Sequence, residues 1–307
     1  MSRRGWPLAR TLALGLTVVL VSPLSPLVLV GVPLAVFLLA FPGRSPATAA
    51  LAGLILVAVL SGLSTASSPV WFAERAWAFL LAGGFVVATL LAPGGAPLRR
   101  SIVALAITLG SVALFAGLRP EAVAEVDWWI GMRLERAVYL AHEWTGSPVL
   151  AGLAATLRKA VRIQTALYPA LLGLASLGAL GLAWYVAARL RGAEESPAPL
   201  REFRFSDQLV WVLIGGLLLF LLPAGELAAR LGENAMAFMG GLYLVRGLAV
   251  LAWIGALLVT SAWSVALWTL LAVLFYPVIV GAALVVGLGD TWLDLRARWR
   301  RASDGAE

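Results

Sequence analysis

Nine apolar runs follow one another along the chain, and they constrain its fold more than any other feature of the sequence. Runs of about 20 apolar residues are long enough to cross a bilayer as helices. With 61% hydrophobic and 13% charged residues, the chain exceeds what one water-soluble core can bury, since soluble domains are roughly half apolar and a quarter charged. We therefore predict an all-α, polytopic transmembrane helical bundle. The runs are Leu8–Val21, Leu27–Phe41, Thr48–Leu63, Val70–Leu91, Ile102–Leu118, Ala166–Leu190, Leu209–Leu222, Ala237–Val259 and Ala262–Val286.

The placement of arginine sets the expected number of spans. Nine spans would put the basic residues Arg296–Arg301 outside the cell, against the positive-inside bias. One run is therefore expected to be re-entrant or to lie on the surface, which leaves about eight spans (range roughly 7–9) and both termini inside. Proline is expected to interrupt the chain at Ser22–Pro26 and at Pro277. The basic residues then expected inside on short connections are Arg3, Arg4, Arg10, Arg44, Arg99, Arg100, Arg189, Arg191, Arg201 and Arg204.

The connections between the runs divide the chain into six segments. The stretch 191–207 contains Glu, Pro and Arg and is the best candidate for a central linker. The predicted segments are N-terminal transmembrane helices (1–118), an amphipathic extracytoplasmic segment (119–163), a transmembrane helix (164–190), a cytoplasmic linker (191–207), C-terminal transmembrane helices (208–288) and a basic cytoplasmic tail (289–307).

The segment 119–163 is predicted to form an amphipathic helix, because its apolar residues recur at helical spacing and its charges fall largely elsewhere. Trp128 and Trp129 suit the headgroup layer of a membrane. Two interpretations stay open: a helix lying on the membrane surface, and a helix packed on the spans of the protein itself. The apolar positions are Val123, Val126, Ile130, Leu134, Val138 and Ala141.

Several kinds of active site lack their usual residues in this sequence. There is no cysteine, and His142 is the single histidine, so neither a His-Glu-x-x-His site nor a cysteine-based site can form. The phosphate-binding Gly-x-x-x-x-Gly-Lys-Ser/Thr motif is also absent, which makes ATP hydrolysis by this chain improbable. The arginines flank apolar runs, a pattern typical of topology control and not of nucleic-acid binding. We predict no catalytic residue, metal, cofactor or nucleic-acid partner, although interfacial lipid chemistry stays open.

Arg246 lies in the middle of the run Ala237–Val259, where a charge costs about 2.5–3.5 kcal/mol on insertion scales. It is expected to face a cavity or an acidic partner. One interpretation is a polar binding site or conduction path within the bundle. The other is a structural ion pair, or an arginine that snorkels from a span whose ends lie elsewhere. The candidate partners are Glu226, Glu233 and Glu74, and the candidate ligand-binding residues are Arg246, Asn234, Tyr243 and Glu233.

Two further polar features have structural interpretations as well as functional ones. Asn234 is expected to cap the helix that follows it, or to line the mouth of a pocket. Asp290, Asp294 and Arg298 are spaced one helical turn apart, which is typical of a stabilising ladder of charges. Two carboxylates could also bind a divalent cation, but a single pair is a weak indication of such a site.

The C-terminal half resembles the YybS-like family of bacterial multi-pass membrane proteins. The resemblance rests on Phe203–Phe205 with Trp211, Gly232–Asn234, Leu242–Tyr243 with Gly247–Leu248, and Gly287–Arg296. That family is distantly similar to the substrate-binding membrane subunits of energy-coupling-factor vitamin transporters. The resemblance implies a helical bundle that binds a small molecule and relies on partner subunits for ATP.

We accordingly expect a transporter-type, small-molecule-binding membrane subunit without its own ATPase. Its partners would be the lipid bilayer, other membrane subunits and an ATPase. The alternative is a scaffolding membrane protein that organises envelope or signalling partners. Lys159 is the single lysine beside many arginines, a bias typical of a GC-rich bacterial genome, so the expected location is the bacterial inner membrane.

Overall fold

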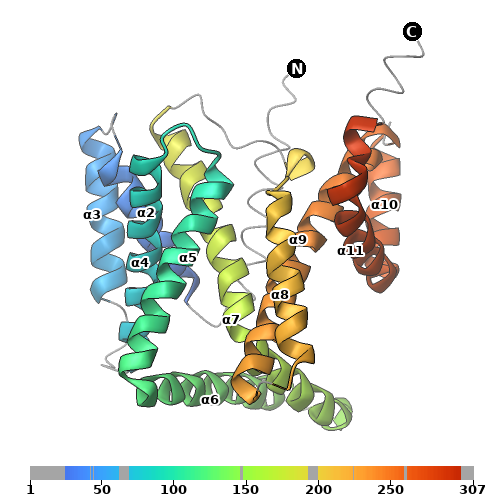
Figure 1. Cartoon of the computed structure of the whole chain (residues 1–307), viewed down its shortest axis with the longest axis horizontal. Helices are drawn as coiled ribbons and strands as arrows, with labels where there is room; N and C mark the ends of the chain where they lie inside the picture. Colours follow the sequence, from blue (N-terminus) through green and yellow to red (C-terminus); the bar gives the residue numbers. More distant parts are fainter. Residues whose placement is uncertain are drawn as a thin grey trace. The chain divides into compact units, whose positions relative to one another are not determined.

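The computed structural model describes residues 25–41, 43, 45–61, 69–145, 148–192, 200–223, 225–258 and 261–298 (Figure 1). Across these ranges every regular element is a helix, which confirms the all-α class. The chain forms two compact units. Of the described residues, those from 25 to 192 form the N-terminal unit and those from 200 to 298 form the C-terminal unit. The predicted span Leu8–Val21 lies outside the described residues.

Each helix described in the N-terminal unit begins at a proline. Proline suits this place because the amide hydrogen that it lacks would have no partner inside the helix. The helices are α2 (Pro26–Ala40), α3 (Pro46–Ser61), α4 (Pro69–Leu91), α5 (Pro97–Leu118), α6 (Pro120–Thr145) and α7 (Pro148–Leu190).

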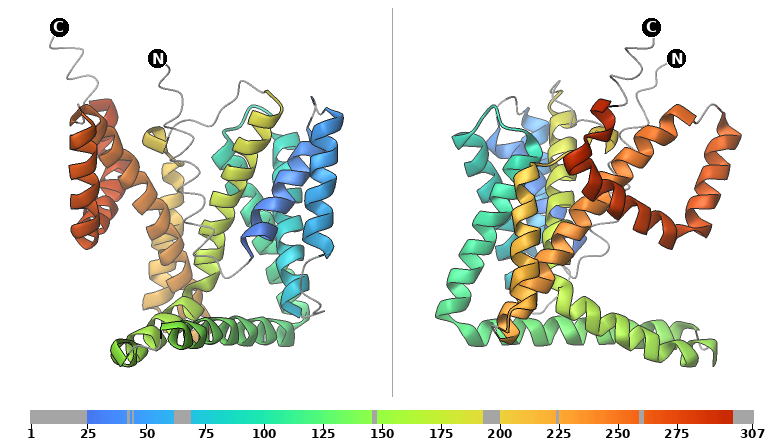
Figure 2. Two further views of the ribbon diagram at one scale, coloured as in Figure 1. Left: turned by 180° about the vertical axis from the view of Figure 1, so that it is seen from behind. Right: turned by 45° about the vertical axis from the view of Figure 1, so that its right-hand side comes forward.

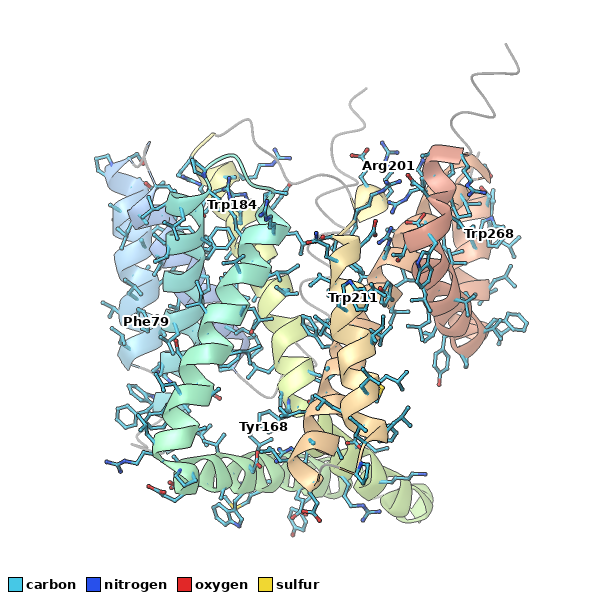
Figure 3. All side chains as sticks on the ribbon, in the orientation of Figure 1. Phe79, Tyr168, Trp184, Arg201, Trp211 and Trp268 are labelled. Atoms are coloured by element: carbon cyan, nitrogen blue, oxygen red, sulfur yellow. The ribbon has the colours of Figure 1, made fainter. Side chains whose placement is uncertain are left out.

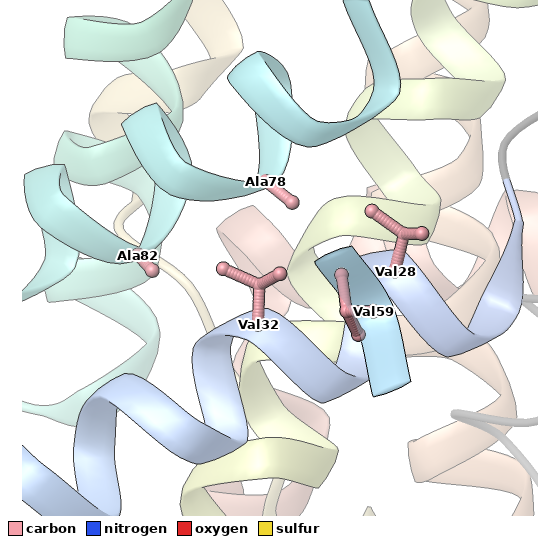
Figure 4. Close-up of a cluster of buried hydrophobic side chains, with 5 residues drawn as sticks. All are labelled: Val28, Val32, Val59, Ala78 and Ala82. Carbon is pink, nitrogen blue, oxygen red and sulfur yellow. The ribbon is translucent and has the colours of Figure 1, made fainter. Parts of the chain in front are cut away.

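Helix α2 is the centre of the N-terminal unit and packs against α3, α4 and α7. A cluster of small and β-branched side chains fills the contact between α2, α3 and α4 (Figure 4). Helices α4 and α7 are joined by a buried hydrogen bond from Trp77 Nε1 to Ser176 Oγ, 2.9 Å long. Because apolar burial in this unit is continuous across four helices, it forms one core. The residues of the cluster are Val28, Val32, Val59, Ala78 and Ala82.

Helix α6 runs crosswise at the end of α5 and packs against α7, α5 and α4 (Figure 2). Ile130 is buried in this contact, whereas Trp128 and Tyr139 are about 60% exposed (60% and 61%). The structure therefore contains the packing of this helix on the protein itself, and its location on the membrane surface stays a prediction. Of the predicted apolar face, the side chains of Val123, Leu134, Val138 and Ala141 lie outside the described residues.

The predicted amphipathic segment 119–163 is not one helix, because α7 already begins at Pro148. The first part of α7 runs beside α6, and the helix then turns to run along the other helices of the unit (Figure 2). Pro169 lies inside α7, and an internal proline removes a backbone hydrogen bond and bends a helix. The part of α7 that is long and apolar enough to cross a membrane is Arg162–Leu190.

The C-terminal unit begins with two single turns of 3-10 helix, followed by four α-helices. The run predicted as Ala262–Val286 is divided at Phe275, and Pro277 lies in the first turn of the second helix. The predicted interruption at Pro277 is therefore confirmed. The elements are η2 (Leu200–Glu202), η3 (Asp207–Leu209), α8 (Val210–Leu221), α9 (Glu226–Leu258), α10 (Ala262–Leu274) and α11 (Tyr276–Leu293).

Glycines let the helices of the C-terminal unit approach closely. A Cβ atom on Gly216 of α8 would lie 2.8 Å from the Cβ of Ala235 in α9, and one on Gly232 would lie 2.6 Å from the carbonyl oxygen of Gly216. Small residues at such contacts are typical of helix pairs in membranes, where backbones pack directly.

Five of the described helices are long and apolar enough to cross a membrane, and three apolar helices are shorter. The total of about eight spans stays a prediction. The five are Val70–Leu91, Pro97–Leu118, Arg162–Leu190, Glu226–Gly255 and Tyr276–Leu293, and the shorter ones are Pro26–Ala40, Pro46–Ser61 and Asp207–Leu221.

Candidate functional site

Helices α9 and α11 touch through their backbones at Gly247 and Gly287. A Cβ atom on Gly247 would lie 1.7 Å from the carbonyl oxygen of Ala283, and one on Gly287 would lie 2.0 Å from that of Tyr243. No side chain larger than hydrogen fits at either place without a shift of the helices. The contact brings together their polar neighbours, because Arg246 directly precedes Gly247 and Asp290 follows Gly287 by about one turn.

Arg246 binds two aspartates in this unit. Its Nε donates to Asp290 Oδ2 over 3.0 Å, and its Nη2 donates to the backbone oxygen of the same residue, also over 3.0 Å. Its Nη1 donates to Asp207 Oδ1 over 2.8 Å, and its guanidinium carbon lies 5.3 Å from the ring centre of Phe205. We call Arg246, Asp290, Asp207 and Arg296 the C-terminal charge cluster.

Arg296 is the second cation of the C-terminal charge cluster. Its Nη2 donates to Asp290 Oδ2 over 2.9 Å, and its Nη1 donates to the backbone oxygen of Arg201 over 3.0 Å. Both Nη atoms also donate to the backbone oxygen of Phe203, each over 3.2 Å. Arg296 therefore fixes the extended segment before α8 against the end of α11.

A left-handed residue at the end of α11 makes this arrangement possible. Asp294 has φ 40° and ψ 59°, a region that aspartate enters more readily than most residues. The turn lets the amide of Leu295 donate to Asp290 Oδ1 over 3.1 Å and brings Arg296 back to Asp290. Asp294 itself pairs with Arg204, Oδ1 to Nη2 over 2.5 Å, and both side chains are more than two-fifths exposed (46% and 42%).

The side chains of the C-terminal charge cluster differ in how much of their surface is exposed. The side chains of Asp290, Arg296 and Arg246 are 0%, 1% and 4% exposed, whereas that of Asp207 is 63% exposed. Two arginines and two aspartates make the cluster neutral as a whole. Three of the four charges are therefore buried and paired with one another, and the fourth, that of Asp207, lies at the surface of the unit.

The predicted partners of Arg246 are wrong. Asp290 and Asp207 hold it, in place of Glu226, Glu233 or Glu74. Of the two interpretations of Arg246, the ion pair is the one that the structure contains. Arg246 lies inside the candidate span Glu226–Gly255, in its second half, where it contacts the exposed Asp207.

The other predicted ligand-binding residues lie at different depths of α9. Tyr243 is 2% exposed and packs its ring 5.2 Å from that of Phe205, next to the cluster. The hydroxyls of Tyr243 and Thr291 are buried next to each other. Asn234 and Glu233 lie about 18 Å and about 20 Å before Arg246 along the helix, at a rise of roughly 1.5 Å per residue, and so do not join the cluster.

The prediction that Asn234 caps a helix is wrong. Asn234 lies inside α9 and donates from Nδ2 to the backbone oxygen of Arg230 over 2.9 Å. The ladder predicted for Asp290 and Asp294 is also different, because these residues pair with arginines from three other places in the unit. Within the described part of the chain, no group of three or more His, Cys, Asp or Glu residues could hold a metal ion.

Sequence reasoning missed Asp207 and Arg296 as members of this site. Asp207 was assigned to the linker and Arg296 to the basic tail. A usable signal existed, because Ala283 and Gly287 form a small-xxx-small pair that ends three residues before Asp290, and Gly247 directly follows Arg246.

Residues 9–291 match the family described as Predicted membrane protein (DUF2232). The chain belongs to this family. The match includes both units and three members of the charge cluster, Asp207, Arg246 and Asp290. It agrees with the apolar helices in assigning a membrane protein. No curated protein and no solved structure matches the chain, and the narrower resemblance to the YybS-like family stays a prediction.

Proposed function

We propose that this membrane protein is a transporter-type subunit of the bacterial inner membrane that binds a small anionic molecule at Arg246. The main support for this function is that the two carboxylates bound to Arg246 differ in burial and in the number of their contacts. Asp290 is fully buried and shared with Arg296, whereas Asp207 is 63% exposed and touches only one nitrogen of the guanidinium.

An exposed carboxylate on a buried arginine can be exchanged for another anion. Asp207 lies on the turn η3, the first turn of the helix that continues as α8, so its displacement would disturb only the start of that helix. A carboxylate or phosphate of a ligand would make the same contact with Arg246 Nη1, and arginine is suited to both groups. The ring of Phe205 and the buried hydroxyl of Tyr243 lie next to this position and would contribute to recognition.

The proposal assigns no chemical reaction to the chain. The sequence has no ATP-binding motif, so transport would need partner subunits, including an ATPase. Membership of a membrane-protein family and the several apolar helices support the location of such a subunit.

A thermal-shift screen of the detergent-solubilised protein tests the proposal. The panel would hold vitamin-like metabolites with a carboxylate or phosphate, each beside its neutral amide or alcohol. We expect an anion to stabilise the protein and its neutral analogue to have no effect. Asp207→Asn should tighten binding about tenfold because it removes the competing carboxylate, and Arg246→Gln should abolish binding.

Arg204→Gln is the matched control, since Arg204 also pairs with an aspartate of this unit but is exposed. It should leave the affinity unchanged. Failure of every anion in the panel to stabilise the wild type, together with unchanged stability of Arg246→Gln, would reject the proposal.

A scaffolding function is the second candidate, and the exposed aromatic side chains on α6 favour it. Trp128 and Tyr139 face away from the unit on a helix that also packs against three others. Crosslinking followed by co-purification separates the two functions. An ATPase and a second membrane subunit in the complex support transport, and envelope or signalling proteins support scaffolding.

A further inference from the structure

A second group of arginines lies at the end of the N-terminal unit where α5 begins and α7 ends, around Trp184 (Figure 3). The guanidinium carbons of Arg100 and Arg191 lie 6.0 Å and 5.7 Å from the ring centre of Trp184. Arg191 also lies 5.3 Å from the ring centre of Phe41. We call these four residues the aromatic arginine cluster.

Arg100 is buried without full pairing. The residue is 7% exposed, its Nη2 donates to the backbone oxygen of Pro93, and its Nε is buried with no hydrogen-bond partner. Buried polar atoms are nearly always paired. Arg296 Nε is also unpaired, but the charge of Arg296 is compensated by Asp290, whereas no described carboxylate compensates that of Arg100, which points to a missing acceptor.

Arg191 is half-buried, and its Nε donates to the backbone oxygen of Ala187 over 3.1 Å. Burial lowers the pKa of Arg191 below the usual value of arginine, and no carboxylate offsets this effect. An arginine stays protonated despite such a shift, so the charge remains.

Neither arginine has a carboxylate partner in the part of the chain that the structure describes. The aromatic rings and the end of α7 explain where the side chains lie, but they do not neutralise two positive charges. The start of α5 adds to the positive potential, since Ala96 provides no side-chain cap and amide groups at a helix start favour anions.

We propose that the aromatic arginine cluster binds a phosphate group, from the headgroup of an anionic lipid or from a soluble phosphate. Arginine forks match phosphate oxygens in geometry and charge. The partly exposed ring of Phe41, which packs on the buried Trp184, provides an apolar surface for an acyl chain or a neutral part of the ligand. The cluster lies at the ends of two membrane-type helices, the depth at which tryptophan and headgroups meet.

The full chain, purified in a neutral detergent, is suited to the test. Native mass spectrometry would count phosphatidylglycerol and phosphatidylcholine molecules retained from mixed micelles. A thermal-shift series with inorganic phosphate, and with chloride at equal ionic strength, would run in parallel. We expect retention of phosphatidylglycerol over phosphatidylcholine, or stabilisation by phosphate over chloride.

Three variants locate the binding. Arg191→Gln should weaken it about tenfold, as expected when a charged hydrogen-bond donor is lost. Arg100→Gln should do the same, and the partly exposed Arg191 keeps the test decisive if the Arg100 variant does not fold. Arg99→Gln is the matched control, because Arg99 is exposed at the same helix start, and it should have no effect.

The outcomes separate the two sources of phosphate. Lipid retention that depends on Arg191, with no effect of inorganic phosphate, assigns a lipid headgroup. Stabilisation by inorganic phosphate that depends on Arg191 assigns a soluble ligand. Equal binding by the wild type and Arg191→Gln, or an equal loss in Arg99→Gln, would overturn the proposal.

Discussion

Each of the two units of this protein contains a group of arginines. The two groups differ in what compensates the free-energy cost of burying their charges. In the C-terminal charge cluster, Arg246 and Arg296 share Asp290, and Asp207 completes a neutral set. In the aromatic arginine cluster, Arg100 and Arg191 lie beside Trp184 without a described carboxylate.

This difference indicates what each group of arginines contributes to the protein. A neutral, mutually paired set stabilises the contact of the helices that carry it, and it resists change because each charge depends on the others. Arginines that rest on aromatic rings keep an unsatisfied attraction for anions. The paired cluster is therefore expected to dominate folding stability, and the unpaired one to dominate sensitivity to anions.

Asp290→Asn is expected to lower the free energy of unfolding more than any other substitution considered for the two clusters. It would leave Arg246 and Arg296 buried with reduced compensation, and breaking a buried pair costs about 3–5 kcal/mol. The free energy of unfolding in mixed micelles is the measurement. A loss below that caused by Arg191→Gln would contradict the stabilising function assigned to the paired cluster.

Gly247→Ala should destabilise the C-terminal unit by about 1–3 kcal/mol, because the added methyl group overlaps the backbone of α11. Gly240→Ala in the same helix is the control, since nothing lies within 4 Å of its Cβ position. That change should stabilise α9 by about 0.5–1 kcal/mol, as alanine favours helix over glycine. A change of the same sign in the free energy of unfolding of both variants would contradict the close backbone contact between α9 and α11 at Gly247.

Arg191→Gln should change the free energy of unfolding by less than about 1 kcal/mol in neutral detergent, since it removes a cation–aromatic contact and also a desolvated charge. With phosphatidylglycerol present, the wild type should gain stability that the variant lacks. The melting temperature with and without the lipid is the measurement. A large loss in neutral detergent would mean that Arg191 is a structural residue.

Asp294→Asn should have the smallest effect, about 0–1 kcal/mol, because exposed ion pairs contribute little. Asparagine also accepts the left-handed conformation of this residue. Urea unfolding at low and high salt checks the prediction. A loss close to that of Asp290→Asn would mean that exposure does not distinguish the two aspartates.

The positions of the helices could largely be predicted from the sequence, because lipid and core burial both require long apolar stretches. The interruption before Pro277 followed from the missing amide hydrogen of proline. The start of α9 could not be predicted in this way. Its first residues, 226–236, include Arg230, Glu233 and Asn234, yet they are helical because they pack on α8 through Gly232.

The candidate site was predictable only at Arg246. The free-energy cost of placing the charge of Arg246 in an apolar run required an acidic partner. Hydropathy, however, does not show which of the distant aspartates this partner is. Asp290 is 44 residues away and Asp207 is 39 residues away. The choice depends on where two glycines let the backbones touch, which is a property of the folded pair of helices and not of either segment.

Helix α7 has a consequence for the layout of the protein at the membrane. Its 43 residues would measure about 65 Å if straight, about twice the roughly 30 Å thickness of a hydrocarbon core. The part before Arg162 must therefore lie outside the lipid tails, and it carries the exposed Lys159, the single lysine of the chain. The side-chain amine of Lys159 thus serves as a natural label: its modification by a membrane-impermeant amine reagent applied to intact cells, read at this residue by peptide mapping, would show on which side of the membrane this helix lies.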